Sequence, residues 1–107
     1  MKNVWPEEVY QKVSILDLIL VAVFSLGKTE NSFEVILKQC FDFFPRKFSF
    51  LKLDLPDSRK IDRPLRTLRN QKLIRGNPQD EYCLTPKGKK KAMEAMNLLR
   101  QKKLKLK

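Results

Sequence analysis

Residues 57–88 read DSRKIDRPLRTLRNQKLIRGNPQDEYCLTPKG, and this stretch carries the signals that decide the expected fold. A helix is expected over 57–72, because Ile61, Leu65 and Leu68 recur at helical spacing and define one apolar face. Basic residues are the commonest type at the remaining positions. The helix is therefore expected to be apolar on one side and strongly cationic on the other.

A β-hairpin is expected directly after this helix. Its strands are predicted over 73–75 and 81–85, with a turn over 76–80 that contains Gly, Asn and Pro. Thr85 and Pro86 then begin another helix, because threonine is a favoured N-cap and proline is favoured at the first helical position.

The chain as a whole is expected to form one domain over 1–101, followed by a basic, frayed tail over 102–107. The remaining helices of that domain are predicted near 5–13, 15–26, 32–44 and 86–101. The helix over 15–26 is apolar on most of its circumference, so it should lie at the centre of the core. The segment 45–56, PRKFSFLKLDLP, is expected to be an ordered loop held down by its aromatic residues.

Two stretches of this sequence resemble those of bacterial and archaeal winged-helix proteins. They are LRTLRNQKLIRG at 65–76 and YCLTPKG at 82–88. In such proteins the recognition helix ends much like L-x-x-L-x-x-x-G-L-I, and the wing closes with L-T-x-x-G. Here Lys72 stands where the glycine is customary. FFPRKFSF at 43–50 and DSRKIDRPLR at 57–66 look like an uncharacterised prokaryotic branch of the same superfamily.

The resemblance implies a mainly α fold with a small β-hairpin. More narrowly, it implies a winged helix-turn-helix with an extra short N-terminal helix and a C-terminal helix. The function that it implies is generic, because winged helices bind DNA but also serve as protein-interaction modules.

Positive charge is concentrated in the second half of the chain. The net charge is +11, with 23 Lys and Arg against 12 Asp and Glu. Residues 1–56 hold seven basic and seven acidic side chains, whereas 57–107 hold sixteen basic and five acidic ones. Such segregation indicates one basic face and a polyanionic partner.

Several function classes are disfavoured. The sequence has no His, which excludes His-based triads, His metal sites and imidazole acid–base catalysis, and it has no Gly-rich phosphate loop. Neither an enzyme, nor a cofactor, nor a metal site is therefore expected, and no small-molecule ligand is evident. Cys40 and Cys83 are expected to be ordinary buried or half-buried thiols. No signal peptide or membrane-spanning run is recognised, so the protein is expected to be cytoplasmic with no membrane partner.

The cationic face of the helix over 57–72 is the expected site of double-stranded DNA binding. At about 100° per residue, Arg59, Arg63, Arg66 and Asn70 fall within about 60° of one another. Arginine and asparagine can make bidentate hydrogen bonds to guanine and adenine, respectively, in the major groove. The wider expected DNA-binding set is Arg59, Lys60, Arg63, Arg66, Arg69, Asn70, Arg75, Gln79 and Lys87. The alternative is a solvated helix face, which most charge runs are.

Pro64 leaves the start of this helix open. If the helix begins at Ser58, Pro64 lies in its second turn and removes one backbone hydrogen bond. If it begins at Arg63, with Asp62 as the cap, Pro64 is well accommodated but Arg59 leaves the row.

A DNA-binding protein, most simply a transcriptional regulator, is the favoured function. Many such proteins are homodimers. Apolar surface that could serve a homodimer, or could equally be buried within one chain, is expected at Val4, Trp5, Val9, Tyr10, Met93 and Leu98. The alternative from another class is an adaptor that binds protein as a subunit of a larger complex, with an exposed apolar patch around Phe48, Phe50 and Trp5. A third, weaker alternative is the binding of structured RNA by the same basic face.

Overall fold

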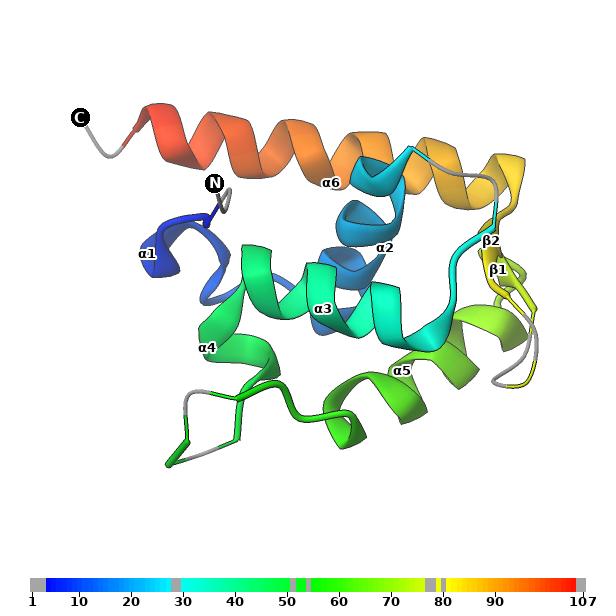
Figure 1. The fold of residues 1–107 in the computed structure, drawn as a ribbon. Coiled ribbons are helices and arrows are strands. Elements are labelled where there is room, and N and C mark those ends of the chain that lie inside the picture. The colour runs from blue at the N-terminus through cyan, green and yellow to red at the C-terminus, as the bar shows by residue number, and fades with distance from the viewer. Residues whose placement is uncertain are drawn as a thin grey trace.

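The computed structural model describes residues 4–27, 30–50, 52–53, 55–76, 79 and 81–105. The fold is mainly helical with a small antiparallel hairpin, as predicted (Figure 1). The elements are α1 (Glu7–Tyr10), α2 (Ile15–Leu26), α3 (Phe33–Phe43), α4 (Pro45–Phe48), α5 (Arg59–Asn70), β1 (Ile74–Arg75), β2 (Cys83–Leu84) and α6 (Pro86–Leu104).

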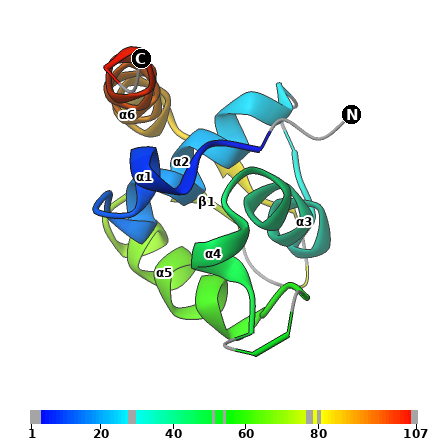
Figure 2. The ribbon, with the colours of Figure 1, turned by 90° about the vertical axis from the view of Figure 1, so that its left-hand side faces the viewer.

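Helix α2 forms the centre of the core, as its composition predicts. Its residues 18–23 are all buried, and α3, α5 and α6 pack around it (Figure 2). The Ser14 hydroxyl accepts a hydrogen bond from the Leu16 amide at 3.2 Å at the start of the helix, and Gly27 ends it. A helix surrounded in this way must be apolar all round, which explains its lack of a polar face.

The segment 45–56 is ordered, but it is not only a loop. Residues Pro45–Phe48 form the short helix α4, which proline favours in its first position. Phe48 is fully buried, and its carbonyl accepts a hydrogen bond from the Asp57 amide at 2.7 Å. Leu53 and Leu55 are more than half exposed. The anchor of this connection is therefore Phe48 together with backbone hydrogen bonds, not every apolar residue in it.

Helix α5 begins at Arg59 and keeps Pro64 in its second turn, which resolves the alternative that the sequence leaves open. The Asp57 carboxylate accepts a hydrogen bond from the Arg59 amide at 3.1 Å, so Asp57 caps the first turn. Ile61, Leu65 and Leu68 are buried, as predicted. The helix ends at Asn70, two residues before the expected end.

The end of α5 explains the role of Lys72. The Leu73 amide donates to the Leu68 carbonyl and the Lys72 amide to the Arg69 carbonyl, both at 3.0 Å. This pair of bonds is a Schellman motif, whose penultimate residue adopts the left-handed conformation. Lys72 does so, with φ of 62°, at the position where the resemblance makes glycine customary. A residue with a side chain is less stable than glycine in this conformation, so Lys72 makes the turn less stable than glycine would.

The hairpin is shorter than expected, since each strand has two residues, with Ile74 opposite Leu84 and Arg75 opposite Cys83. Residues 77, 78 and 80 of the expected turn lie outside the described residues. A third segment pairs with the hairpin at Asn31. The Asn31 amide donates to the Tyr82 carbonyl at 2.8 Å, and the Tyr82 amide donates to the Asn31 carbonyl at 2.7 Å. The segment before α3 is thus tied to the hairpin.

The first turn of α6 packs directly on the end of α5. The Thr85 hydroxyl accepts from the Gly88 amide at 3.0 Å and donates to the Lys72 carbonyl at 2.7 Å. A Cβ added at Gly88 would overlap the Leu73 carbonyl oxygen, so only glycine allows this approach. The start at Thr85 and Pro86 is confirmed, but α6 extends to Leu104, three residues beyond its predicted end at residue 101 and into the segment expected to be a tail.

Replacing Lys72 by glycine should raise the free energy of unfolding by about 1 kcal/mol, because glycine adopts a positive φ without the steric penalty of a side chain. Chemical denaturation of wild type and Lys72→Gly measures the change. Gln71→Gly, one residue earlier in the αR region, is the matched control and should destabilise. Stabilisation by the control but not by Lys72→Gly would contradict the assigned turn.

Replacing Gly88 by alanine should destabilise the fold by about 1–3 kcal/mol, because the new methyl group displaces the Leu73 backbone. The sign is informative, since alanine is favoured over glycine by about 1 kcal/mol inside an unobstructed helix. Asn97→Ala, at an exposed position of the same helix, serves as the comparison and should be neutral or stabilising. A Gly88→Ala protein that is more stable than wild type would show that α6 does not contact Leu73 in this way.

Candidate nucleic-acid interface

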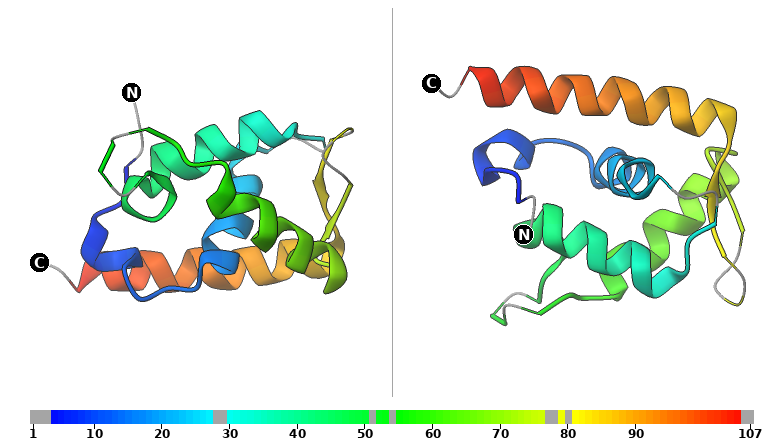
Figure 3. Two further views of the ribbon diagram at one scale, coloured as in Figure 1. Left: turned by 90° about the horizontal axis from the view of Figure 1, so that it is seen from below. Right: turned by 45° about the horizontal axis from the view of Figure 1, so that its top comes forward.

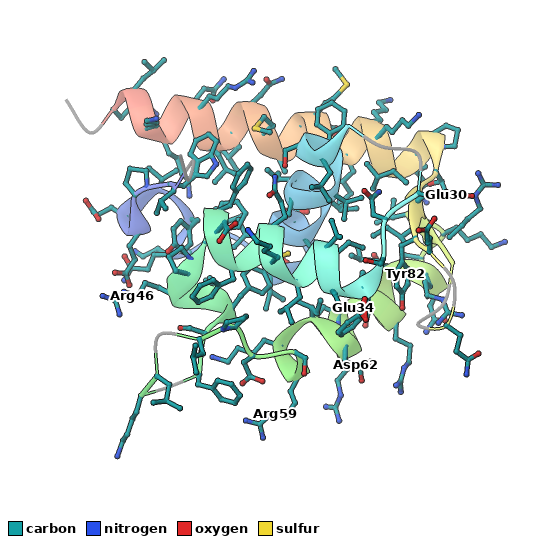
Figure 4. All side chains as sticks on the ribbon, viewed as in Figure 1. Glu30, Glu34, Arg46, Arg59, Asp62 and Tyr82 are labelled. Atoms are coloured by element: carbon teal, nitrogen blue, oxygen red, sulfur yellow. The ribbon has the colours of Figure 1, made fainter. Side chains whose placement is uncertain are left out.

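The expected row on α5 is present on the exposed side of that helix. Arg59, Arg63, Arg66 and Asn70 are exposed, whereas the opposite side is buried. Figure 4 shows Arg59 and Asp62 projecting from α5 away from the rest of the fold. Pro64 does not break the helix, so all four residues share one continuous element.

Arg59 is held in place by its neighbours. Its guanidinium contacts the Asp57 carboxylate, with Nε 3.2 Å from Oδ1, and lies 5.7 Å from the centre of the Phe50 ring. The hydrogen bond from the Arg59 side chain holds the pKa of Asp57 below its ordinary value. The Arg59 side chain is still 80% exposed. Arg59 therefore offers a positioned donor at one end of the row, with part of its charge already compensated.

The middle of the row is less compensated. Arg66 lies 3.6 Å from the Asp62 carboxylate, one helical turn away, but both side chains are more than half exposed. Such a surface pair is weak, so a phosphate or base edge can compete for Arg66. No carboxylate lies within ion-pair distance of Arg63 among the described residues. Arg63 is thus the least compensated arginine of the row.

A shallow groove lies beside the first half of α5, where the starts of α2 and α3 approach it. Its volume is about 670 Å³. The lining combines apolar Ile15, Phe33 and Pro64 with cationic and polar side chains, which are Ser58, Arg59, Lys60, Asp62 and Arg63. Positive groups above an apolar floor suit a sugar–phosphate segment or a thymine methyl group beside the helix.

Tyr82 lies next to the hairpin and is buried. Burial raises the pKa of Tyr82, the charge of Arg69 acts in the opposite direction, and Asp62 adds to the rise. The charges of two α5 residues therefore act on the Tyr82 hydroxyl. The bridge to Asn31 holds the Tyr82 backbone in place. Nothing in the sequence pattern around Asn31 signals this contact.

The other expected DNA-binding residues lie around this helix. Lys60 is half-buried in the groove wall, and Arg69 is exposed on α5. Arg75 is exposed on β1, and Gln79 is exposed in the hairpin turn. Lys87 is exposed in the first turn of α6, above the end of α5. The structure thus gathers six of the nine expected residues on α5 and places the other three on the neighbouring hairpin and α6.

Two expectations about apolar surface are wrong. Val9 and Tyr10 are buried within the chain, because Tyr10 packs edge-on against Phe44 and its hydroxyl accepts from the Arg46 amide at 3.2 Å. They cannot contribute to a homodimer. Phe48 is also fully buried, so the exposed patch expected of an adaptor around Phe48, Phe50 and Trp5 does not exist in that form.

The two cysteines are free thiols, as expected. Cys40 is buried and Cys83 half-buried. Burial raises the pKa of the Cys40 thiol well above its ordinary value, which makes it unreactive. Within the described part of the chain, no group of three or more His, Cys, Asp or Glu side chains could hold a metal ion.

No protein-family model matches this chain, and no match is found among curated proteins or solved structures. No helix among the described residues is long and apolar enough to cross a membrane.

Proposed function

We propose that this protein is a winged helix-turn-helix protein that binds double-stranded DNA with α5 in the major groove. The observation that carries the proposal is α5 itself. Its inner face is buried by Ile61, Leu65 and Leu68, while its outer face presents exposed Arg63 and Arg66. A helix of this kind at the edge of a small fold can enter a groove that admits a helix.

The surroundings of α5 support the same orientation. The helix is fixed at its start by Asp57, at its end by the Schellman turn, and along its inner side by the buried residues Ile61, Leu65 and Leu68. Rigid placement matters because bidentate contacts with base edges tolerate little displacement. Arg75, Gln79 and Lys87 flank the helix and fit contacts with the phosphate backbone.

A transcriptional regulator in the cytoplasm is the simplest role for such a protein, and we propose that role. A homodimer also stays a prediction. Of the residues expected to form its interface, Val4, Met93 and Leu98 are exposed. The adaptor alternative loses the apolar patch on which it depended. Binding of structured RNA by the same face remains the competing nucleic-acid target.

Fluorescence anisotropy with a random duplex, a single strand and an RNA hairpin tests the proposal. The duplex should bind with an affinity that falls steeply with salt, because phosphate neutralisation releases counterions. Replacing both Arg63 and Arg66 by alanine should weaken duplex binding about tenfold or more at moderate salt, since two cations that face the phosphates are lost and fewer counterions are released.

The control is a double variant with the same net charge, Lys12→Ala/Arg46→Ala, which removes two exposed cations from the first half of the chain. It should bind the duplex within about threefold of wild type, because a distant surface charge contributes mainly to long-range attraction. An equal loss of duplex affinity in both variants would mean that the effect comes from net charge alone and not from α5. A preference for the RNA hairpin would favour the competing target.

A further inference from the structure

Most of the surplus positive charge lies on α6 and not on the helix that carries the proposed function. Helix α6 holds seven basic residues and one acidic residue, Glu94. Helix α5 holds five basic residues and one acidic residue. Since the net charge of the chain is +11, α6 alone supplies more than half of it. A single DNA-binding face on α5 leaves this charge without a role.

The charges of α6 are uncompensated. Among the described residues, no carboxylate lies within ion-pair distance of any basic side chain of α6. Lys87, Lys89, Lys90 and Lys91 occupy the first two turns and are exposed. Positive charge there opposes the helix dipole, and Lys87 and Lys91 repel each other at i,i+4 spacing. A bound polyanion would remove this unfavourable repulsion.

Helices α5 and α6 lie at opposite edges of the fold, with the buried α2 between them (Figures 1 and 2). They approach each other only where Thr85 bonds to Lys72 at the start of α6. From there α6 runs over 19 residues, which is about 28 Å of helix. Its second half therefore ends beside α1, away from α5, in both views of Figure 3. Arg100, Lys102 and Lys103 therefore lie at the end of α6 that is remote from α5.

The second half of α6 has its own receptive surface. A pocket of about 390 Å³ lies beside it and is lined by Val4, Trp5, Ser25, Phe43, Met96, Arg100 and Lys103. The lining holds two cations and no carboxylate. The Lys103 ammonium lies 5.4 Å from the centre of the Trp5 ring. Trp5 is the one tryptophan of the chain, so its fluorescence reports on this surface alone.

We propose that α6 is a second phosphate-binding surface, and that one molecule therefore holds two segments of duplex DNA, one on α5 and one on α6. The second half of this inference depends on the proposed function of α5, whereas phosphate binding by α6 does not. The cations of α6 form one cluster near each end of the helix, at 87–91 and at 100–103. Duplex DNA is favoured over an acidic peptide because a duplex carries phosphates densely enough to meet both clusters at once.

A capture experiment tests the second surface. One duplex is immobilised, protein is added, and the retention of a second, labelled duplex is measured at low and moderate salt. Wild type should retain the labelled duplex. The variant Arg100→Gln/Lys102→Gln/Lys103→Gln should still bind one duplex in solution but retain about tenfold less of the second, because its contacts with phosphate are lost. The charge-matched variant Lys12→Gln/Lys38→Gln/Arg46→Gln, altered elsewhere on the surface, should retain it as wild type does.

Trp5 fluorescence separates this inference from the proposed function. Phosphate binding at Lys103 should draw the ammonium away from the ring and change the emission, in wild type and equally in Arg63→Ala/Arg66→Ala. If that α5 variant binds and captures duplex as wild type does, the proposed function of α5 is wrong, but a retained Trp5 response still supports α6.

Three results would overturn the second surface. One is full capture by the Arg100/Lys102/Lys103 variant. A dimer that bridges two duplexes through its two α5 helices would give this result, and a mass measurement by light scattering would identify the dimer. Another is no change in Trp5 emission on addition of duplex. The last is a Trp5 response to vesicles of anionic phospholipid without any response to duplex, which would make α6 a membrane-facing surface.

Discussion

The backbone carbonyls of Lys72 and Leu73 form the junction on which the arrangement of this molecule depends. The Lys72 carbonyl accepts a hydrogen bond from the Thr85 hydroxyl. The Leu73 carbonyl accepts one from the Thr85 amide and lies against Gly88. The end of α5, the hairpin and the start of α6 are therefore fixed at one point. Because α6 and α2 form much of the core, this junction also holds the outer face of α5 in a fixed orientation, which a helix must have to present arginines to a groove.

The charges follow from the same arrangement. Both cationic helices bury an apolar stripe against α2 and leave their basic residues outside, so one core supports two separate cationic edges. On α5 the charge is partly compensated, through Asp57 at Arg59 and Asp62 at Arg66. On α6 no carboxylate of a described residue lies within ion-pair distance of a basic side chain. This contrast is consistent with the two different modes of phosphate contact proposed for the two helices.

The sequence predicts the helices well because their signals are local. Ser14, Ser32 and Thr85, residue types that favour the N-cap position, each accept a hydrogen bond from the first turn of the helix that follows. The contacts that it does not predict join residues far apart in the chain, such as Asn31 with Tyr82, and no periodic pattern reports them. Phe48 and Tyr10 look available for a partner in the sequence because hydrophobicity does not tell an interior position from an interface. The site residues of α5 follow from helical periodicity, whereas the separation of α5 from the end of α6 requires the fold.

In the proposed complex the outer face of α5 contacts DNA. Titration of the ¹⁵N-labelled protein with a short duplex, followed by two-dimensional NMR, tests it most directly, because every amide reports on its own surroundings. The largest shifts are expected for amides of Arg59–Asn70, together with shifts along α6, while α4 and the second half of α3 stay nearly unchanged. If the duplex binds but the amide signals of α5 do not shift, contact between α5 and DNA is contradicted.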